Sequence, residues 1–270
     1  MGSIGIVGAG QLGTVLAERL VALGHEVRIA NSRGPESLRD IARRTGAIAV
    51  NSREVAANAD MLILAIPLGN VPALPKDLVG SMREDAVIID AGNYVPVRDG
   101  SIAEIEGGMP ETAWVAGHLG APVVKALNSI SDLSLKSGGR PAGAPDRIAL
   151  PVAGDDPQAR AAVMRLVEEL GFDGWEAGPL SDSWRQQLGQ SAYCTDATLK
   201  QLPGLLARAK RETVTPKRQE AMKLMARLPQ NFSKATLLKA ARFMAGLDRG
   251  KPATWLAMLR LAAVMARRPS

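Results

Sequence analysis

Short apolar runs alternate with longer segments of helical spacing along the first part of the chain. The run over residues 3–7 ends in glycines, and apolar side chains then recur every three or four positions up to Leu23, with Gly24 ending the predicted helix. A second strand is predicted over 26–30 and a second helix over 37–44. This alternation is typical of a parallel sheet with helices on its faces.

The same alternation continues further along the chain. Continuous apolar runs, typical of parallel strands covered on both faces, occupy residues 60–66 and 86–90. Further strands are predicted over 122–127 and 147–153, and an amphipathic helix over 157–170. We therefore predict an α/β fold, with a doubly wound Rossmann-type parallel sheet.

The pattern changes near residue 180. Helical runs broken by prolines then continue to the C-terminus without a convincing strand. We expect an NADP-binding Rossmann-type domain over 1–180 and a smaller all-helical C-terminal region over 181–270. Apolar positions in this region are expected to form a buried face: Leu237, Leu238, Ala241, Met244, Trp255, Leu256, Leu259 and Val264.

Charge divides the chain in a similar way. The net charge is +6, but residues 207–270 hold fifteen of the 33 Lys and Arg and three of the 27 acids, so this stretch carries +12 and the rest −6. Apolar residues interleaved with these charges favour a helical cap that also forms a homodimer. Contact of the basic tail with nucleic acid or an anionic membrane is the less favoured alternative.

Composition excludes several classes of protein. Hydrophobic residues make up 46% of the chain and charged residues 22%, as in ordinary globular proteins. One cysteine, Cys194, and two histidines exclude a disulfide framework and predict no metal site. No secretory signal and no apolar segment of membrane-spanning length is visible, so we expect a cytoplasmic protein.

The turn after the first strand has the spacing of a dinucleotide fingerprint. In Gly-Ala-Gly-Gln-Leu-Gly, residues 8–13, a strand enters and an amphipathic helix leaves. Gly8 permits the tight turn, Gly10 lets the backbone approach a pyrophosphate, and Gly13 allows close packing of helix on strand. The helix opens with Gln11 and Leu12, and its N-terminus offers free N–H groups to phosphates. The alternative is a purely structural glycine turn.

The end of the second strand indicates which dinucleotide is bound. Sites for NAD usually carry an acid here for the ribose 2′-OH, whereas this chain has Asn31, Ser32 and Arg33. The Arg33 guanidinium offers a planar cation to an adenine 2′-phosphate, and its two neighbours can form hydrogen bonds with it. NADP(H) is therefore the predicted cofactor, against the alternative of a polar turn with one solvated arginine.

Further candidates lie at other strand ends and beyond the sheet. Ile66 and Pro67 are expected to press on the nicotinamide ring and Asn93 to bond a ribose or carboxamide, unless they are ordinary loop residues. Trp184 and Tyr193 flank the expected cleft between the two parts. They would stack on a planar acceptor or, alternatively, anchor the core.

No residue stands out as an acid–base catalyst. Asn128, Tyr193 and His118 are the candidates, although His118 falls in a helix expected over 111–119, which favours a surface or helix-end position. Lys125 precedes Asn128 by three residues, a pairing known from β-hydroxyacid dehydrogenases, but an apolar strand favours a salt-bridged structural lysine. Cys194 has no nearby histidine to activate it and is expected to be a buried small residue.

Four stretches carry a family resemblance. They are the glycine turn over 8–13, Asn-Ser-Arg-Gly-Pro-Glu over 31–36, Val-Val-Lys-Ala-Leu-Asn-Ser-Ile over 123–130 and Gly-Phe-Asp-Gly-Trp-Glu-Ala-Gly-Pro-Leu over 171–180. Together they make the chain similar to the NADP-dependent oxidoreductases of the coenzyme F420-dependent reductase family, over about two thirds of its length. That family shares its dinucleotide-binding domain with pyrroline-5-carboxylate reductases and STEAP metalloreductases.

The resemblance implies an NADPH domain that delivers a hydride to a flavin-like or deazaflavin (F420) acceptor. Ser32 and Arg33 match the family's 2′-phosphate contacts, and Asn128 matches its acceptor-side asparagine. Members usually end soon after the Gly-Pro-Leu stretch or continue into a membrane domain, whereas this chain continues for about ninety residues as a basic tail. The alternatives are an imine or carbonyl reductase and a non-enzymatic NADP-sensing module with a basic docking tail.

Overall fold

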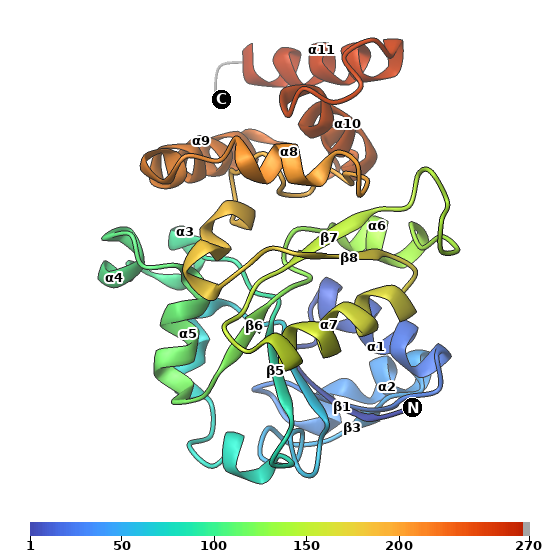
Figure 1. Cartoon of the computed structure of the whole chain (residues 1–270), viewed down its shortest axis with the longest axis vertical. Coiled ribbons are helices and arrows are strands. Elements are labelled where there is room, and N and C mark those ends of the chain that lie inside the picture. Colours follow the sequence, from blue (N-terminus) through green and yellow to red (C-terminus); the bar gives the residue numbers. More distant parts are fainter. Residues whose placement is uncertain (267–270) are drawn as a thin grey trace.

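A computed structural model describes residues 1–266, and its centre is a six-stranded parallel sheet (Figure 1). The strands lie in the order β3-β2-β1-β4-β5-β6. Their bounds are β1 (Ser3–Val7), β2 (Glu26–Ala30), β3 (Ile48–Ala49), β4 (Met61–Leu64), β5 (Val87–Asp90) and β6 (Val123–Lys125). This is the strand order of the doubly wound dinucleotide-binding fold, so the predicted fold class is confirmed.

Helices cover both faces of the sheet, because successive strand residues point to opposite sides. Ile4 and Ile6 of β1 belong to the core on one face, whereas Val7 belongs to the core on the other. The first face is covered by η1 (Pro35–Leu38), α1 (Gln11–Ala22), α2 (Arg39–Thr45), α6 (Asp132–Ser137) and α7 (Pro157–Glu169). The second is covered by η2 (Leu68–Ala73), η3 (Val79–Ser81), α4 (Ala103–Glu106) and α5 (Glu111–Leu119), and α3 (Pro96–Asp99) lies against η2.

Two further strands form a separate ribbon. β7 (Ala149–Val152) and β8 (Asp173–Glu176) pair in parallel with each other, and an antiparallel bridge joins Lys125 to Ala153. The strand predicted over 147–153 therefore exists but does not extend the parallel sheet, because it runs against β6. The hydrophobic pattern misses β8, whose residues are half-buried or exposed and include no apolar run.

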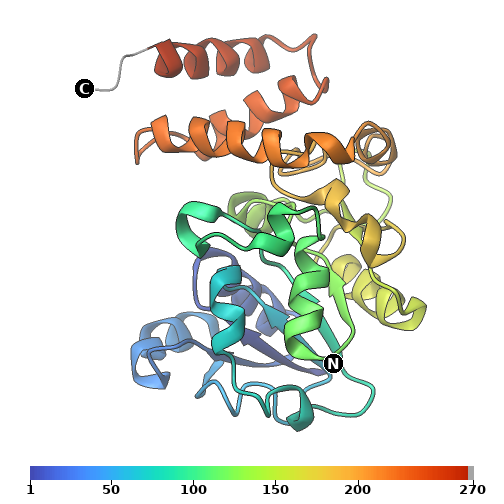
Figure 2. The same ribbon diagram turned by 90° about the vertical axis from the view of Figure 1, so that its left-hand side faces the viewer.

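Helices make up the region after residue 180. Figures 1 and 2 show α8 to α11 stacked on one side of the α/β part. The elements are η4 (Leu180–Gln186), α8 (Leu202–Ala207), η5 (Arg211–Thr213), α9 (Val214–Arg227), α10 (Lys234–Met244) and α11 (Pro252–Ala266). The described part of this region contains no strand. A smaller helical region after the sheet is thus confirmed.

The apolar face expected on the last two helices is largely exposed. The small core between α10 and α11 is formed by Ala240, Ala257 and Leu261. Because α10 covers only one side of α11, three large side chains of α11 remain more than half exposed: Trp255 (54%), Leu256 (51%) and Leu259 (64%). The expectation of a buried face is wrong for these three residues and for Met244, which is 51% exposed.

Many cations of the C-terminal region have partners within the molecule. Arg218 is buried, and Arg242 donates hydrogen bonds to the carbonyl oxygens of Thr195 and Asp196. Two further basic residues, Arg267 and Arg268, lie outside the described residues. Across residues 1–266, no helix is long and apolar enough to cross a membrane.

Candidate functional site

At two positions of the turn between β1 and α1, only glycine fits, because the backbone of another segment lies too close for a side chain. Gly8 has φ +112°, and a Cβ built there would lie 2.3 Å from the carbonyl oxygen of Ala65. A Cβ at Gly13 would lie 2.0 Å from the carbonyl oxygen of Gly8. Any larger residue at these positions would push the helix away from the strand.

The middle glycine, Gly10, faces open space instead. It has φ −74°, and an added Cβ would meet no atom within 4 Å. Gly10 caps α1 without a side-chain hydrogen bond, and the first turn of the helix contains no acid. Gln11 is exposed, whereas Leu12 is half-buried and packs against the core. An open cradle before an uncapped helix N-terminus fits a pyrophosphate.

The turn after β2 lies beside this cradle, since the N–H of Gly8 donates to the carbonyl oxygen of Ala30 over 2.8 Å. Asn31 shapes the turn, because its Oδ1 accepts the N–H of Arg33 over 2.9 Å. Ser32 and Arg33 are exposed, and no hydrogen bond or ion pair within residues 1–266 engages the Arg33 guanidinium. That guanidinium is available to an anionic ligand.

Two other strand ends complete the carboxyl edge of the sheet. Ile66 and Pro67 follow β4 and are half-buried, with Ile66 directly beside Gly8. Asn93 follows β5, and its Oδ1 accepts from Nδ2 of Asn128 over 3.1 Å. The structure therefore brings these predicted cofactor residues to one edge, where doubly wound folds bind ligands.

Asn128 is buried, and its amide is occupied by the protein. Besides Asn93, its Nδ2 donates to the carbonyl oxygen of Gln186 over 2.8 Å, and its Oδ1 accepts from Nε2 of Gln186 over 3.1 Å. In this arrangement Asn128 orients Asn93 and does not face solvent, so the expected contact with an acceptor would require these bonds to open. Sequence reasoning missed Gln186, although the polar run Gln-Gln-Leu-Gly-Gln over 186–190 marks the segment.

Lys125 lies in a buried group of charges beneath this edge. Its ammonium lies 2.6 Å from the carbonyl oxygen of Gly92, 3.2 Å from the carboxylate of Asp90 and 3.6 Å from that of Glu111. Burial raises the pKa of Glu111, while the nearby charges of Lys125 and Arg218 act to lower it. A salt-bridged structural lysine, the favoured interpretation, is what the structure contains.

Of the two aromatic candidates, Trp184 is a core anchor. This residue is 6% exposed and packs with Ala209 and Val214, so the stacking of an acceptor on its ring is not supported by this arrangement. Tyr193 is half-buried, and burial raises its pKa well above the usual range. The Tyr193 hydroxyl therefore stays protonated at neutral pH.

Cys194 follows Tyr193 and is held against the loop after β6. Its backbone N–H donates to the carbonyl oxygen of Ser129 over 2.8 Å. Burial raises the pKa of its thiol to about 12, so the thiolate is scarce at neutral pH. In residues 1–266 no group of three or more His, Cys, Asp or Glu is arranged to hold a metal ion.

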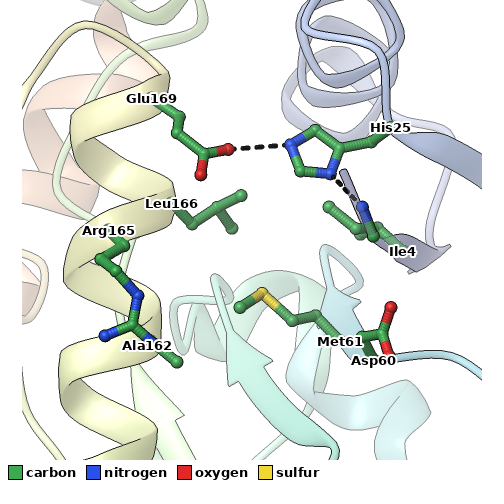
Figure 3. A pocket seen from close by; sticks show the side chains of 9 residues that line it. Ile4, His25, Asp60, Met61, Ala162, Arg165, Leu166 and Glu169 are labelled. Atoms are coloured by element: carbon green, nitrogen blue, oxygen red, sulfur yellow. Dashed lines mark hydrogen bonds and ion pairs between the residues drawn. The ribbon is translucent and has the colours of Figure 1, made fainter.

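Neither histidine belongs to the carboxyl edge. His118 is exposed in the last turn of α5, which leads into the amino end of β6. His25 lines a pocket of about 100 Å³ at the amino ends of β1 and β4, where Glu169 reaches it from α7 over 2.9 Å (Figure 3). This pocket is too small for a dinucleotide and lies at the wrong edge of the sheet.

Comparisons with known proteins agree with this geometry. Residues 3–94 match the family model described as NADP oxidoreductase, coenzyme F420-dependent. The solved structure of hypothetical protein SMa0349 from Sinorhizobium meliloti is 31% identical, with a TM-score of 0.59 over 68% of this chain and 88% of that one.

Two curated proteins of Escherichia coli (strain K12) match shorter segments. Protein YjhV is 45% identical over 56 residues, which are 21% of this chain and 41% of YjhV. 3-Sulfolactaldehyde reductase is 27% identical over 111 residues, which are 39% of this chain and 37% of the reductase. The matched segments thus span about two fifths of these curated relatives.

Proposed function

The chain belongs to the family of coenzyme F420-dependent NADP oxidoreductases, and from that premise we propose that it transfers a hydride between NADP(H) and a flavin-like or deazaflavin acceptor. One observation carries the cofactor half of this proposal: the open cradle at Gly10, with an unpaired Arg33 guanidinium beside it. We further propose that residues 1–180 hold the cofactor and residues 181–270 cover the site.

Each part of the site has a role in this proposal. The N-terminus of α1 binds the pyrophosphate, and Ser32 and Arg33 bind the 2′-phosphate. Ile66 and Pro67 press the nicotinamide toward the acceptor, while Asn93 holds its ribose or carboxamide. When bound, NADPH supplies a hydride, and the acceptor takes up that hydride together with one proton. The chain orients the two rings and excludes water from between them.

The distribution of titratable groups supports a ring-type acceptor. Both histidines lie away from the carboxyl edge, and the raised pKa of Tyr193 makes it a weak acid. Reduction of an isolated carbonyl or imine needs a proton donor at the reacting atom. Flavin and deazaflavin rings depend less on such a residue, because alignment supplies most of the catalysis.

An acceptor screen tests this proposal directly. NADPH oxidation would be followed at 340 nm with coenzyme F420, FMN, FAD, ferric chelates and cyclic imines in parallel. We expect turnover with a flavin or deazaflavin and little with the imines. Turnover with imines or aldehydes alone would contradict the proposal.

The second candidate is carbonyl reduction. It is favoured by the partial similarity to 3-sulfolactaldehyde reductase. In that reaction Tyr193 would be the proton donor, so Tyr193→Phe should abolish turnover with aldehydes. The same substitution should leave hydride transfer to a flavin within a few-fold of the original enzyme, because no proton from Tyr193 is needed there.

Arg33→Asp is expected to weaken NADPH binding selectively. It removes a charge-assisted contact worth about 1.5–3 kcal/mol and places a carboxylate beside the 2′-phosphate, so NADPH binding should weaken at least about tenfold while NADH binding changes little. Titration of the intrinsic fluorescence with each nucleotide measures both effects. Equal affinities of the original protein for NADH and NADPH would contradict the role of Arg33.

We also propose that the protein forms a homodimer through α11. Trp255, Leu256 and Leu259 are exposed together on this helix, and such a surface is costly to leave in water. A second copy of the chain would cover it. Leu259→Glu should therefore convert dimers to monomers in light scattering, whereas Leu199→Glu, at a residue 45% exposed in a turn, should leave the mass unchanged.

A further inference from the structure

One residue of the C-terminal region reaches the dinucleotide fingerprint. Lys234 is the first residue of α10, and its ammonium lies 3.0 Å from Oε1 of Gln11, the first residue of α1. The same ammonium lies 2.9 and 2.7 Å from the two carboxylate oxygens of Asp132, the first residue of α6. Three segments far apart in sequence thus meet at the mouth of the glycine turn.

This contact brings an ammonium group to the glycine turn, which has no cationic side chain of its own. The segment from Gly8 to Leu16 contains no Lys or Arg, so the turn itself supplies only backbone N–H groups to a pyrophosphate. Asp132 places a carboxylate close by, and that charge alone would repel a phosphate. Lys234 neutralises Asp132 and places charged N–H donors at the same point.

Stability does not explain the arrangement well. The side chains of Lys234 and Asp132 are 48% and 25% exposed, and an ion pair with this exposure contributes little to stability. The Lys234 side chain is also about half exposed, and the Gln11 side chain that it contacts is exposed beside the open cradle. Its bond to the Gln11 amide is the kind that a charged ligand can displace, because a phosphate oxygen is a stronger acceptor than an amide oxygen.

We propose that Lys234 is a cofactor-binding residue. Its ammonium keeps its contact with Asp132 and exchanges the Gln11 amide for an oxygen of the pyrophosphate, so that the C-terminal helical region completes the cofactor site. This inference rests on the binding of NADP(H) at the fingerprint and does not depend on the identity of the acceptor.

Nucleotide titrations of purified full-length variants test this role without any measurement of turnover. In Lys234→Met, both NADPH and NADH should bind about tenfold more weakly, because the pyrophosphate is common to the two and one charge-assisted bond is lost. Lys234→Arg should retain binding to within about threefold, because its charge is kept. Lys239→Met is the matched control: Lys239 is exposed on the same helix, and its substitution should change neither affinity.

Asp132→Asn distinguishes two roles of Lys234: binding of the pyrophosphate, and attachment of α10 to the α/β part. If Lys234 binds the pyrophosphate, removal of the Asp132 charge should leave the affinity unchanged or improve it, because a repulsive carboxylate disappears. If Lys234 only fastens α10 to the α/β part, Asp132→Asn should weaken binding as much as Lys234→Met does. That result would overturn the inference, as would equal affinities in Lys234→Met and Lys239→Met.

The outcome can be told apart from a failure of the cofactor assignment. If the unsubstituted protein bound neither nucleotide, both the assignment of NADP(H) as cofactor and this inference would be contradicted. Both assignments would be supported if the unsubstituted protein binds NADPH, Arg33→Asp weakens the binding of NADPH alone, and Lys234→Met weakens the binding of both nucleotides equally.

Discussion

Gly10→Val is expected to fold normally and to lose dinucleotide binding. Valine tolerates the backbone conformation at this position, where φ is −74°, and its side chain would enter open space. That space is where the backbone would meet the pyrophosphate, so several hydrogen bonds would be lost together. At about 1.5–3 kcal/mol for each bond to a charged group, NADPH affinity should fall more than about a hundredfold.

Two measurements check this expectation. Titration with NADPH gives the affinity, and thermal unfolding without nucleotide shows whether the fold is retained. Gly80→Val is a suitable control, because an added Cβ at Gly80 also meets nothing within 4 Å and Gly80 lies in η3, away from the glycine turn. A folded Gly10→Val protein with unchanged NADPH affinity would show that the turn is purely structural.

Lys125→Met is expected to destabilise the α/β part strongly. Lys125 is fully buried, and its removal leaves the carboxylates of Asp90 and Glu111 without their nearest cation. Breaking a buried ion pair on one side costs about 3–5 kcal/mol, and we expect a loss of this size in the free energy of unfolding. Denaturant titration measures it.

The loss should depend on pH. Burial already raises the pKa of Glu111, and without Lys125 that pKa would rise further. The folded variant then holds a proton that the unfolded chain releases, so its stability falls as the pH rises from the unfolded pKa of Glu111 toward the folded one. Lys125→Met should therefore be less destabilised near pH 5 than near pH 8.

Lys136→Met provides the contrast for a surface lysine. Lys136 lies 3.5 Å from Glu18, and both side chains are about half exposed or more, so its loss should cost less than about 1 kcal/mol. If Lys125→Met were as stable as Lys136→Met, the buried carboxylates of Asp90 and Glu111 would not need Lys125 for their stabilisation.

The sequence was sufficient for the parts of the fold that depend on local pattern. The strands over 3–7 and 26–30 and the helix over 111–119 were predicted to the residue, because a buried strand or an amphipathic helix carries a periodic signal. β8 carries none, since its residues are neither alternately nor continuously buried. The second sheet could not be foreseen, because strand direction depends on long-range pairing.

The same distinction applies to the site. The fingerprint residues and Arg33 were found because their neighbours in sequence are also their neighbours in space. Gln186 and Lys234 were missed, because each reaches the edge of the sheet from a distant segment: Gln186 to Asn128, and Lys234 to Gln11 and Asp132. Only the folded chain reveals such contacts.

The small core between α10 and α11 has a consequence for how the molecule opens. Only three modest side chains, Ala240, Ala257 and Leu261, are fully buried in that core, and the apolar residues packed against them are partly buried, whereas the central strands lie between two large apolar layers. The hairpin of these two helices should therefore open and close many times for each global unfolding event. In deuterated water its amide protons should exchange well before those of β1 and β4, and a protease should cut first in the connection over 228–233.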